Sequence, residues 1–172
     1  TLITSSAASD VYKRQSMARP KVADYEFTTL TPNLGVVLHS DYEKFVVADI
    51  PGIIEGASKG VGLGTRFLRH ISRTKMLLNL IDCSGKSYED ITAEIKKIRH
   101  ELSTYDVMLI KKALWIVINK IDLLNNDEIM RLKDMFKNYE TDVFFISSTT
   151  KVGVKNLTDK IYEFLKYENR TK

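Results

Sequence analysis

Cysteine is almost absent from the sequence, which contains only Cys83. A single cysteine excludes an internal disulfide framework and suits a reducing compartment, so we expect a cytoplasmic protein. No apolar run approaches the roughly 18 residues that a membrane helix requires, and the first residues lack the apolar core of a secretion signal. The three histidines are far apart, without the spacing of metal ligands, so zinc binding is not expected.

Charge of either sign is also not concentrated. The 172 residues carry 26 Lys and Arg against 22 Asp and Glu, a net charge of +4, and the basic residues are scattered. This balance permits contact with an acidic partner such as RNA, but an ordinary solvated surface is the preferred explanation. The length is that of one domain with a sizeable core, which we expect to be a monomer.

Apolar runs of strand length alternate with segments of helical periodicity. In chain order, we predict strands at 34–39, Lys44–Ile50, Met76–Asp82, Ala113–Asn119 and 143–146, and helices at 61–74, 87–102, 127–139 and 154–166. The short link between the first two strands predicts an antiparallel hairpin. The remaining alternation predicts an α/β fold, a doubly wound and mostly parallel sheet covered by helices on both faces.

Polar residues stand where four of these apolar runs finish. They are Asp49, Asp82, Asn119 and Ser147. Ligands of such sheets bind outside the carboxyl ends of the strands. The coincidence predicts a nucleotide-sized site at that edge.

The stretch 49–64, DIPGIIEGASKGVGLG, follows the apolar run 45–48 and begins at the end of a predicted strand. A carboxylate such as Asp49 can hold a cation's water, and glycine lets backbone amides approach an anion closely. This layout indicates a site for phosphate and metal.

A second candidate segment is Asn119, Lys120, Ile121 and Asp122. The Asp122 carboxylate can accept two hydrogen bonds from the ring N–H and exocyclic amine of guanine, and adenine lacks that paired donor edge. Asn119 can contact the base or tie neighbouring loops together, while the stem of Lys120 can lie over the ring. A polar turn that caps the next helix is the alternative.

Two weaker signals accompany these segments. Ser147, Ser148 and Thr149 can present amides to a guanine oxygen, although the same residues suit a simple turn before a helix. The loop 27–31, FTTLT, offers threonine hydroxyls, which are hard oxygen ligands suited to Mg²⁺, but it also fits a solvated loop.

Taken together, the segments resemble the GTPase domain of the Obg family, the ribosome-associated GTPases. The resemblance rests on 18–37 (ARPKVADYEFTTLTPNLGVV), 49–71 (DIPGIIEGASKGVGLGTRFLRHI), 119–122 (NKID) and 147–149 (SST). It implies a P-loop NTPase-like fold of the small-GTPase type that binds GTP and GDP with Mg²⁺.

The resemblance also implies roles for individual residues. Thr29 would be the Mg²⁺ ligand of the first switch loop, and Asp49 would hold a metal-bound water. Gly52 would contact the γ-phosphate, and Asn119, Lys120 and Asp122 would read guanine. The full set of expected nucleotide-binding residues is Phe27, Thr28, Thr29, Leu30, Thr31, Asp49, Ile50, Pro51, Gly52, Asn119, Lys120, Ile121, Asp122, Ser147, Ser148 and Thr149.

Ile53 stands next to Gly52, where many GTPases carry a glutamine that orients the attacking water. The Obg family shares this hydrophobic substitution. An isoleucine cannot polarise water, so we expect slow intrinsic hydrolysis and assign no certain catalytic residue in this water-positioning region.

The sequence contains no G-x-x-x-x-G-K-[ST] motif, the loop that cradles nucleotide phosphates. Gly85-Lys86-Ser87 lacks the upstream glycine, and we interpret it as a turn and helix cap. We therefore expect the domain's first strand and phosphate loop to be missing, which predicts marginal stability and weak GTP binding. The expected divisions are an irregular, foreign-looking segment at 1–17, an incomplete G domain at 18–167 and a tail at 168–172.

The favoured hypothesis is a GTP-binding and GTP-hydrolysing switch acting in assembly of the large ribosomal subunit, with rRNA as a partner. Related DRG proteins and Obg-like ATPases are alternatives, although the complete NKID argues against adenine. An alternative of another class is a ribosome- or RNA-binding module that needs no nucleotide.

Overall fold

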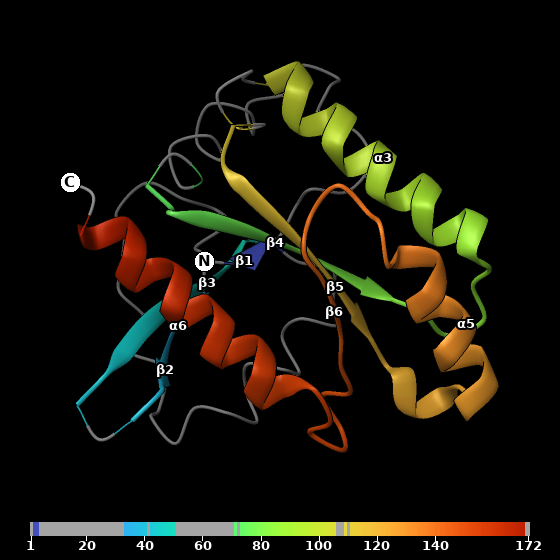
Figure 1. Ribbon diagram of the computed structural model, residues 1–172. Helices are drawn as coiled ribbons and strands as arrows, with labels where there is room; N and C mark the ends of the chain where they lie inside the picture. The colour runs from blue at the N-terminus through green and yellow to red at the C-terminus, as the bar shows by residue number, and fades with distance from the viewer. Residues whose placement is uncertain are drawn as a thin grey trace.

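The chain forms an α/β structure around one sheet, shown by a computed structural model (Figure 1). The residues described are 2–3, 33–40, 42–50, 71, 73–105, 109 and 111–170. Within them the sheet has six strands in the order β2-β3-β1-β4-β5-β6. The strands are β1 (Leu2–Ile3), β2 (Asn33–Leu38), β3 (Lys44–Ile50), β4 (Met76–Asp82), β5 (Ala113–Asn119) and β6 (Val143–Phe145).

The predicted topology is confirmed. β2 and β3 form the antiparallel hairpin, with Val36 opposite Val46, and β3, β1, β4, β5 and β6 run parallel. β3, β4 and β5 have the predicted bounds because each is an apolar run with clear polar ends. β2 and β6 differ from their predicted ends by one residue, although the Ile146 amide just beyond β6 still donates to the Ile118 carbonyl at 2.8 Å.

The centre of the sheet differs from our expectation of a missing first strand. β1 lies between β3 and β4, with Leu2 opposite Asp49 and Ile3 opposite Asn79. The position that we expected to be vacant is therefore occupied over two residues. Pairing there satisfies backbone groups of the flanking strands that would otherwise be buried without partners.

Helices cover both faces of the sheet, as the doubly wound prediction requires. They are α3 (Tyr88–Tyr105), α5 (Asn126–Phe136) and α6 (Val154–Arg170), with the short 3₁₀ helix η2 (Ile121–Leu123) after β5. Alternate residues of β5 separate the two layers: Trp115 and Val117 pack towards α6, and Ile116 and Ile118 pack towards α3 and α5. Figure 1 shows α6 lying apart from α3 and α5.

Helix ends follow local capping more closely than apolar periodicity. The hydroxyl of Ser87 accepts from the Asp90 amide at 3.1 Å, which confirms the predicted cap of α3. A capping box of Asn125 and Glu128 starts α5 one residue before the predicted position, and α5 ends three residues early. α6 continues to Arg170, past its predicted end and into the segment expected to be a tail.

Glycine is required in the turn that joins β6 to α6. Gly153 has φ of 73°, and a Cβ there would lie 2.2 Å from the carbonyl oxygen of Phe145. Gly85 has a similar φ of 65°, but a Cβ there would meet no atom within 4 Å. Any other residue at either position would therefore have a strained backbone, and at Gly153 its Cβ would also clash with the Phe145 carbonyl.

We predict that Gly153→Ala destabilises the fold much more than Gly85→Ala. The left-handed backbone alone costs about 1–2 kcal/mol for alanine, and the contact at Gly153 should at least double this. Urea unfolding of both variants measures the difference. Equal losses would show that the Phe145 carbonyl moves aside at no cost.

Candidate guanine-binding site

The carboxyl ends of neighbouring parallel strands bring three of the polar residues together. Asp82 is the last residue of β4, Asn119 is the last residue of β5, and the two are register partners. Ser147 lies just beyond β6, separated from it by Ile146. Asp49 lies on β3, and β1 separates it from β4. The expected clustering at this edge of the sheet is confirmed for these residues.

Asn119 is fully buried and ties two loops together. Its Oδ1 accepts from the backbone amides of Lys120, at 2.8 Å, and Ser148, at 3.1 Å. Its Nδ2 donates to the hydroxyl of Ser148 at 3.4 Å. The side chain thereby fixes the loop after β5 against the loop after β6, which is one of the two roles that the sequence allowed.

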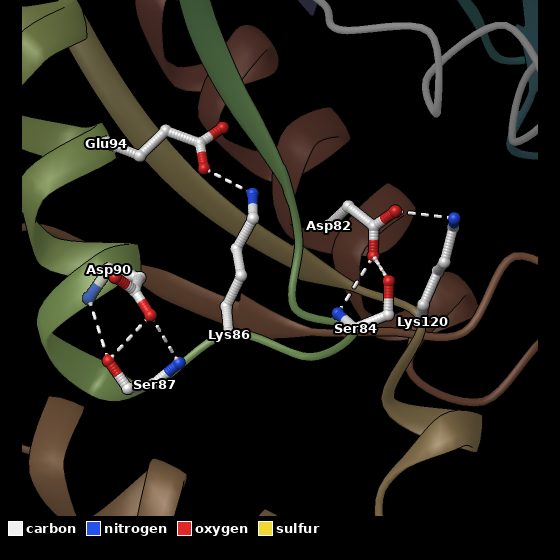
Figure 2. Close-up of polar contacts among 7 residues, drawn as sticks. All are labelled: Asp82, Ser84, Lys86, Ser87, Asp90, Glu94 and Lys120. Carbon is white, nitrogen blue, oxygen red and sulfur yellow. Dashed lines mark hydrogen bonds and ion pairs between the residues drawn. The ribbon is translucent and has the colours of Figure 1, made fainter.

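Lys120 adopts the left-handed conformation, with φ of 69°. This backbone turns the chain sharply out of β5 and into η2. Its ammonium lies 2.5 Å from Oδ2 of Asp82, so the side chain crosses from β5 to the end of β4 (Figure 2).

Asp82 is held by two residues. Its Oδ1 accepts from the amide of Ser84 at 2.9 Å and from the hydroxyl of Ser84 at 2.6 Å. Burial raises the pKa of the Asp82 carboxyl, but hydrogen bonds from Lys120 and Ser84 outweigh it and bring this pKa below its usual range. Asp82 is therefore ionised at neutral pH.

Ile121 and Asp122 point in different directions from the same turn. Ile121 is buried, and its amide donates to the Ile146 carbonyl at 3.3 Å, a second link between the two loops. Asp122 is exposed. An anchored turn with an exposed carboxylate is what a receptor for a paired donor edge requires.

Residues 147–149 form a turn stabilised from within. The Ser147 hydroxyl accepts from the Thr150 amide at 3.0 Å, and the Ser147 amide donates to the Val152 carbonyl at 2.9 Å. Ser147 and Ser148 are buried, whereas Thr149 is exposed. The two serines thus stabilise the loop from inside, and Thr149 is the residue of the three whose side chain is exposed.

Cys83 is a buried residue with a structural role. It is 1% exposed, its amide donates to the Asn119 carbonyl at 3.1 Å, and burial raises the pKa of its thiol to about 11. A protonated, covered thiol is a poor nucleophile.

Gly85-Lys86-Ser87 is a turn and helix cap, as predicted. Ser87 exchanges hydrogen bonds with Asp90, and the Lys86 ammonium lies 2.5 Å from Glu94 on α3 (Figure 2). These partners lie within the loop and the first turns of α3.

The expected phosphate and metal residues fall mostly outside the described residues. The loop 27–31, Pro51, Gly52 and Ile53 lie there, as does the side chain of Ile50. Asp49 is described and is partly buried. Within 33–40, 42–50, 73–105 and 111–170, no group of three His, Cys, Asp or Glu could hold a metal ion. No helix among these residues could cross a membrane.

The sequence predicts Asp82 at this edge of the sheet but does not indicate its partner. The signal was its position, since Asp82 ends the strand beside the one that Asn119 ends. A lysine next to that asparagine can reach one strand across.

Comparisons with known proteins agree with this geometry. Residues 6–120 match the family model of the 50S ribosome-binding GTPases. In an alignment of 158 positions that covers 89% of the chain, the sequence is 46% identical to the GTPase Obg of Oceanobacillus iheyensis. The chain belongs to the Obg family of GTPases. It spans between 37% and 50% of the length of four Obg relatives.

Solved structures share the fold of this Obg-family chain at low sequence identity. The nucleolar GTP-binding protein 1 of Plasmodium falciparum gives a TM-score of 0.64 at 20% identity, covering 99% of this chain and 87% of that one. Era bound to MgGDPNP and a segment of 16S ribosomal RNA gives a TM-score of 0.62 at 17% identity, and the match covers 95% of this chain and 55% of the Era chain.

The buried tie at Asn119 generates a stability prediction. Asn119→Ala leaves two backbone amides without their acceptor and should cost about 2–3 kcal/mol. The control is Asn125→Ala at the exposed start of α5, where loss of a helix cap costs about 1 kcal/mol. Urea unfolding compares the variants, and a cost at Asn119 no greater than at Asn125 would contradict the tie.

Proposed function

We propose that this Obg-family chain binds guanine nucleotides through Asp122 and acts within a GTP-hydrolysing switch. The observation that carries the proposal is the exposed Asp122 carboxylate on a turn anchored by Asn119 and Ile121. Because the anchors are buried, the carboxylate's position is set before a base arrives. Ser147 and Ser148 brace the facing loop, which leaves Thr149 and nearby amides to approach the guanine oxygen.

Guanine follows from the hydrogen-bond pattern of that carboxylate. Asp122 accepts twice and cannot donate, which matches the ring N–H and amine of guanine. An adenine in the same place leaves the carboxylate unpaired, at a cost of about 1–3 kcal/mol. This is discrimination by about fivefold to 150-fold.

The remaining parts of the proposal concern phosphate, metal and partner. We assign Mg²⁺ to Thr29 directly and to Asp49 through water, with Gly52 sensing the γ-phosphate and Ile53 making intrinsic hydrolysis slow. The partly buried carboxylate of Asp49, on a strand of the parallel sheet, suits such an indirect role. We assign the large ribosomal subunit as the partner and the cytoplasm as the location. The description of the matched family, 50S ribosome-binding GTPase, supports that subunit, and the 16S ribosomal RNA bound to Era supports only contact with RNA in general.

The test is equilibrium fluorescence with mant-GDP and mant-ADP in Mg²⁺. We expect mant-GDP to bind at least fivefold tighter than mant-ADP, and Asp122→Ala to remove the preference by weakening mant-GDP alone. Asp127→Ala is the matched control, because Asp127 is an exposed carboxylate in the first turn of α5.

Two outcomes would contradict the proposal. Equal binding of both nucleotides would remove the role of Asp122 in base choice. Absence of binding at millimolar nucleotide, with the variants still folded, would favour a module that contacts RNA without nucleotide.

A further inference from the structure

The Asp82–Lys120 pair includes one residue of the proposed base site but has no part in the hydrogen-bond pattern that selects guanine. Its atoms lie 2.5 Å apart, with the Lys120 side chain 40% exposed and the Asp82 side chain 28% exposed. Figure 2 shows the lysine reaching from the turn after β5 to the end of β4. The pair joins the carboxyl ends of two adjacent strands, and Lys120 precedes Asp122 by two residues in the chain.

Both ends of Lys120 are fixed. At the backbone, its amide donates to Oδ1 of Asn119 at 2.8 Å, and its φ of 69° sets the direction of the side chain. At the tip, the ammonium meets a carboxylate that cannot rotate freely, because Ser84 occupies its other oxygen with two hydrogen bonds. The four methylene groups of the Lys120 side chain, which form its apolar stem, are therefore held at both ends.

We infer that Asp82 is a positioning residue, which holds the stem of Lys120 in place as a surface for the purine ring. This inference rests on the proposed function, since it concerns the same site. A lysine ordered in advance loses less side-chain freedom when a flat ring covers its stem. Asp82 then raises affinity for purines of either kind, whereas Asp122 decides which purine binds.

The test compares Asp82→Asn with Glu94→Gln. Asparagine keeps an oxygen for Ser84 and loses the charge that Lys120 meets. Glu94→Gln neutralises the Lys86–Glu94 pair, which has the same 2.5 Å separation and 33% exposure of both side chains, and is confined to the α3 side (Figure 2). Ser84→Ala is a milder second variant that frees one oxygen of Asp82 only in part.

Two readouts are measured on the whole chain. The first is the ¹⁵N resonance of the Lys120 ammonium, which is assigned by its absence in Lys120→Arg. This resonance is visible only while an ion pair protects the ammonium protons from exchange. The second is affinity for mant-GDP and mant-ADP. We expect Asp82→Asn to abolish the resonance and weaken both nucleotides about fivefold, with an unchanged ratio between them. Ser84→Ala should give about a twofold loss, and Glu94→Gln none.

The outcomes separate this inference from the proposed function. If wild type prefers mant-GDP but Asp82→Asn binds like Glu94→Gln, the inference is wrong and the guanine site stands. If Asp82→Asn changes the ratio between the nucleotides, Asp82 selects the base and does not position Lys120. If wild type binds neither nucleotide, the proposed function fails and the inference, which rests on it, fails too.

Discussion

The rest of the site depends on the hydrogen bonds that the buried side-chain amide of Asn119 makes. One oxygen, Oδ1, accepts from backbone amides on both sides of the site, and the group is fully buried, so neither amide can exchange it for water without cost. This tie holds the left-handed turn at Lys120 against the loop that contains Ser148. Asn119 therefore serves the site mainly as a fastener between two loops.

Parallel pairing explains why such a tie forms in this place. β5 lies between β4 and β6, so a side chain at its carboxyl end can reach the loops that leave either neighbour. Asn119 uses one direction, towards Ser148, and Lys120 uses the other, towards Asp82. The parallel sheet thus allows polar contacts to connect the carboxyl ends of β4, β5 and β6.

The sheet was largely predictable from the sequence because buried strands are continuous apolar runs with polar ends. β3, β4 and β5 follow this rule, and their carboxyl ends located Asp49, Asp82 and Asn119. Helix ends were less predictable. Local capping by Asn125 sets the start of α5, and its apolar periodicity continues to Tyr139 after the helix has ended. β1 and the Asp82–Lys120 pair depend on contacts between distant segments, which periodicity does not encode.

In the proposed function, the anchored loops after β5 and β6 recognise the guanine base. A ¹⁵N–¹H correlation spectrum titrated with guanosine, and separately with adenosine, tests this most directly. We predict that guanosine shifts the amides of Ile121, Asp122 and Thr149, and that adenosine leaves them nearly unchanged at equal concentration. Equal shifts with both nucleosides, or shifts confined to other parts of the chain, would contradict it.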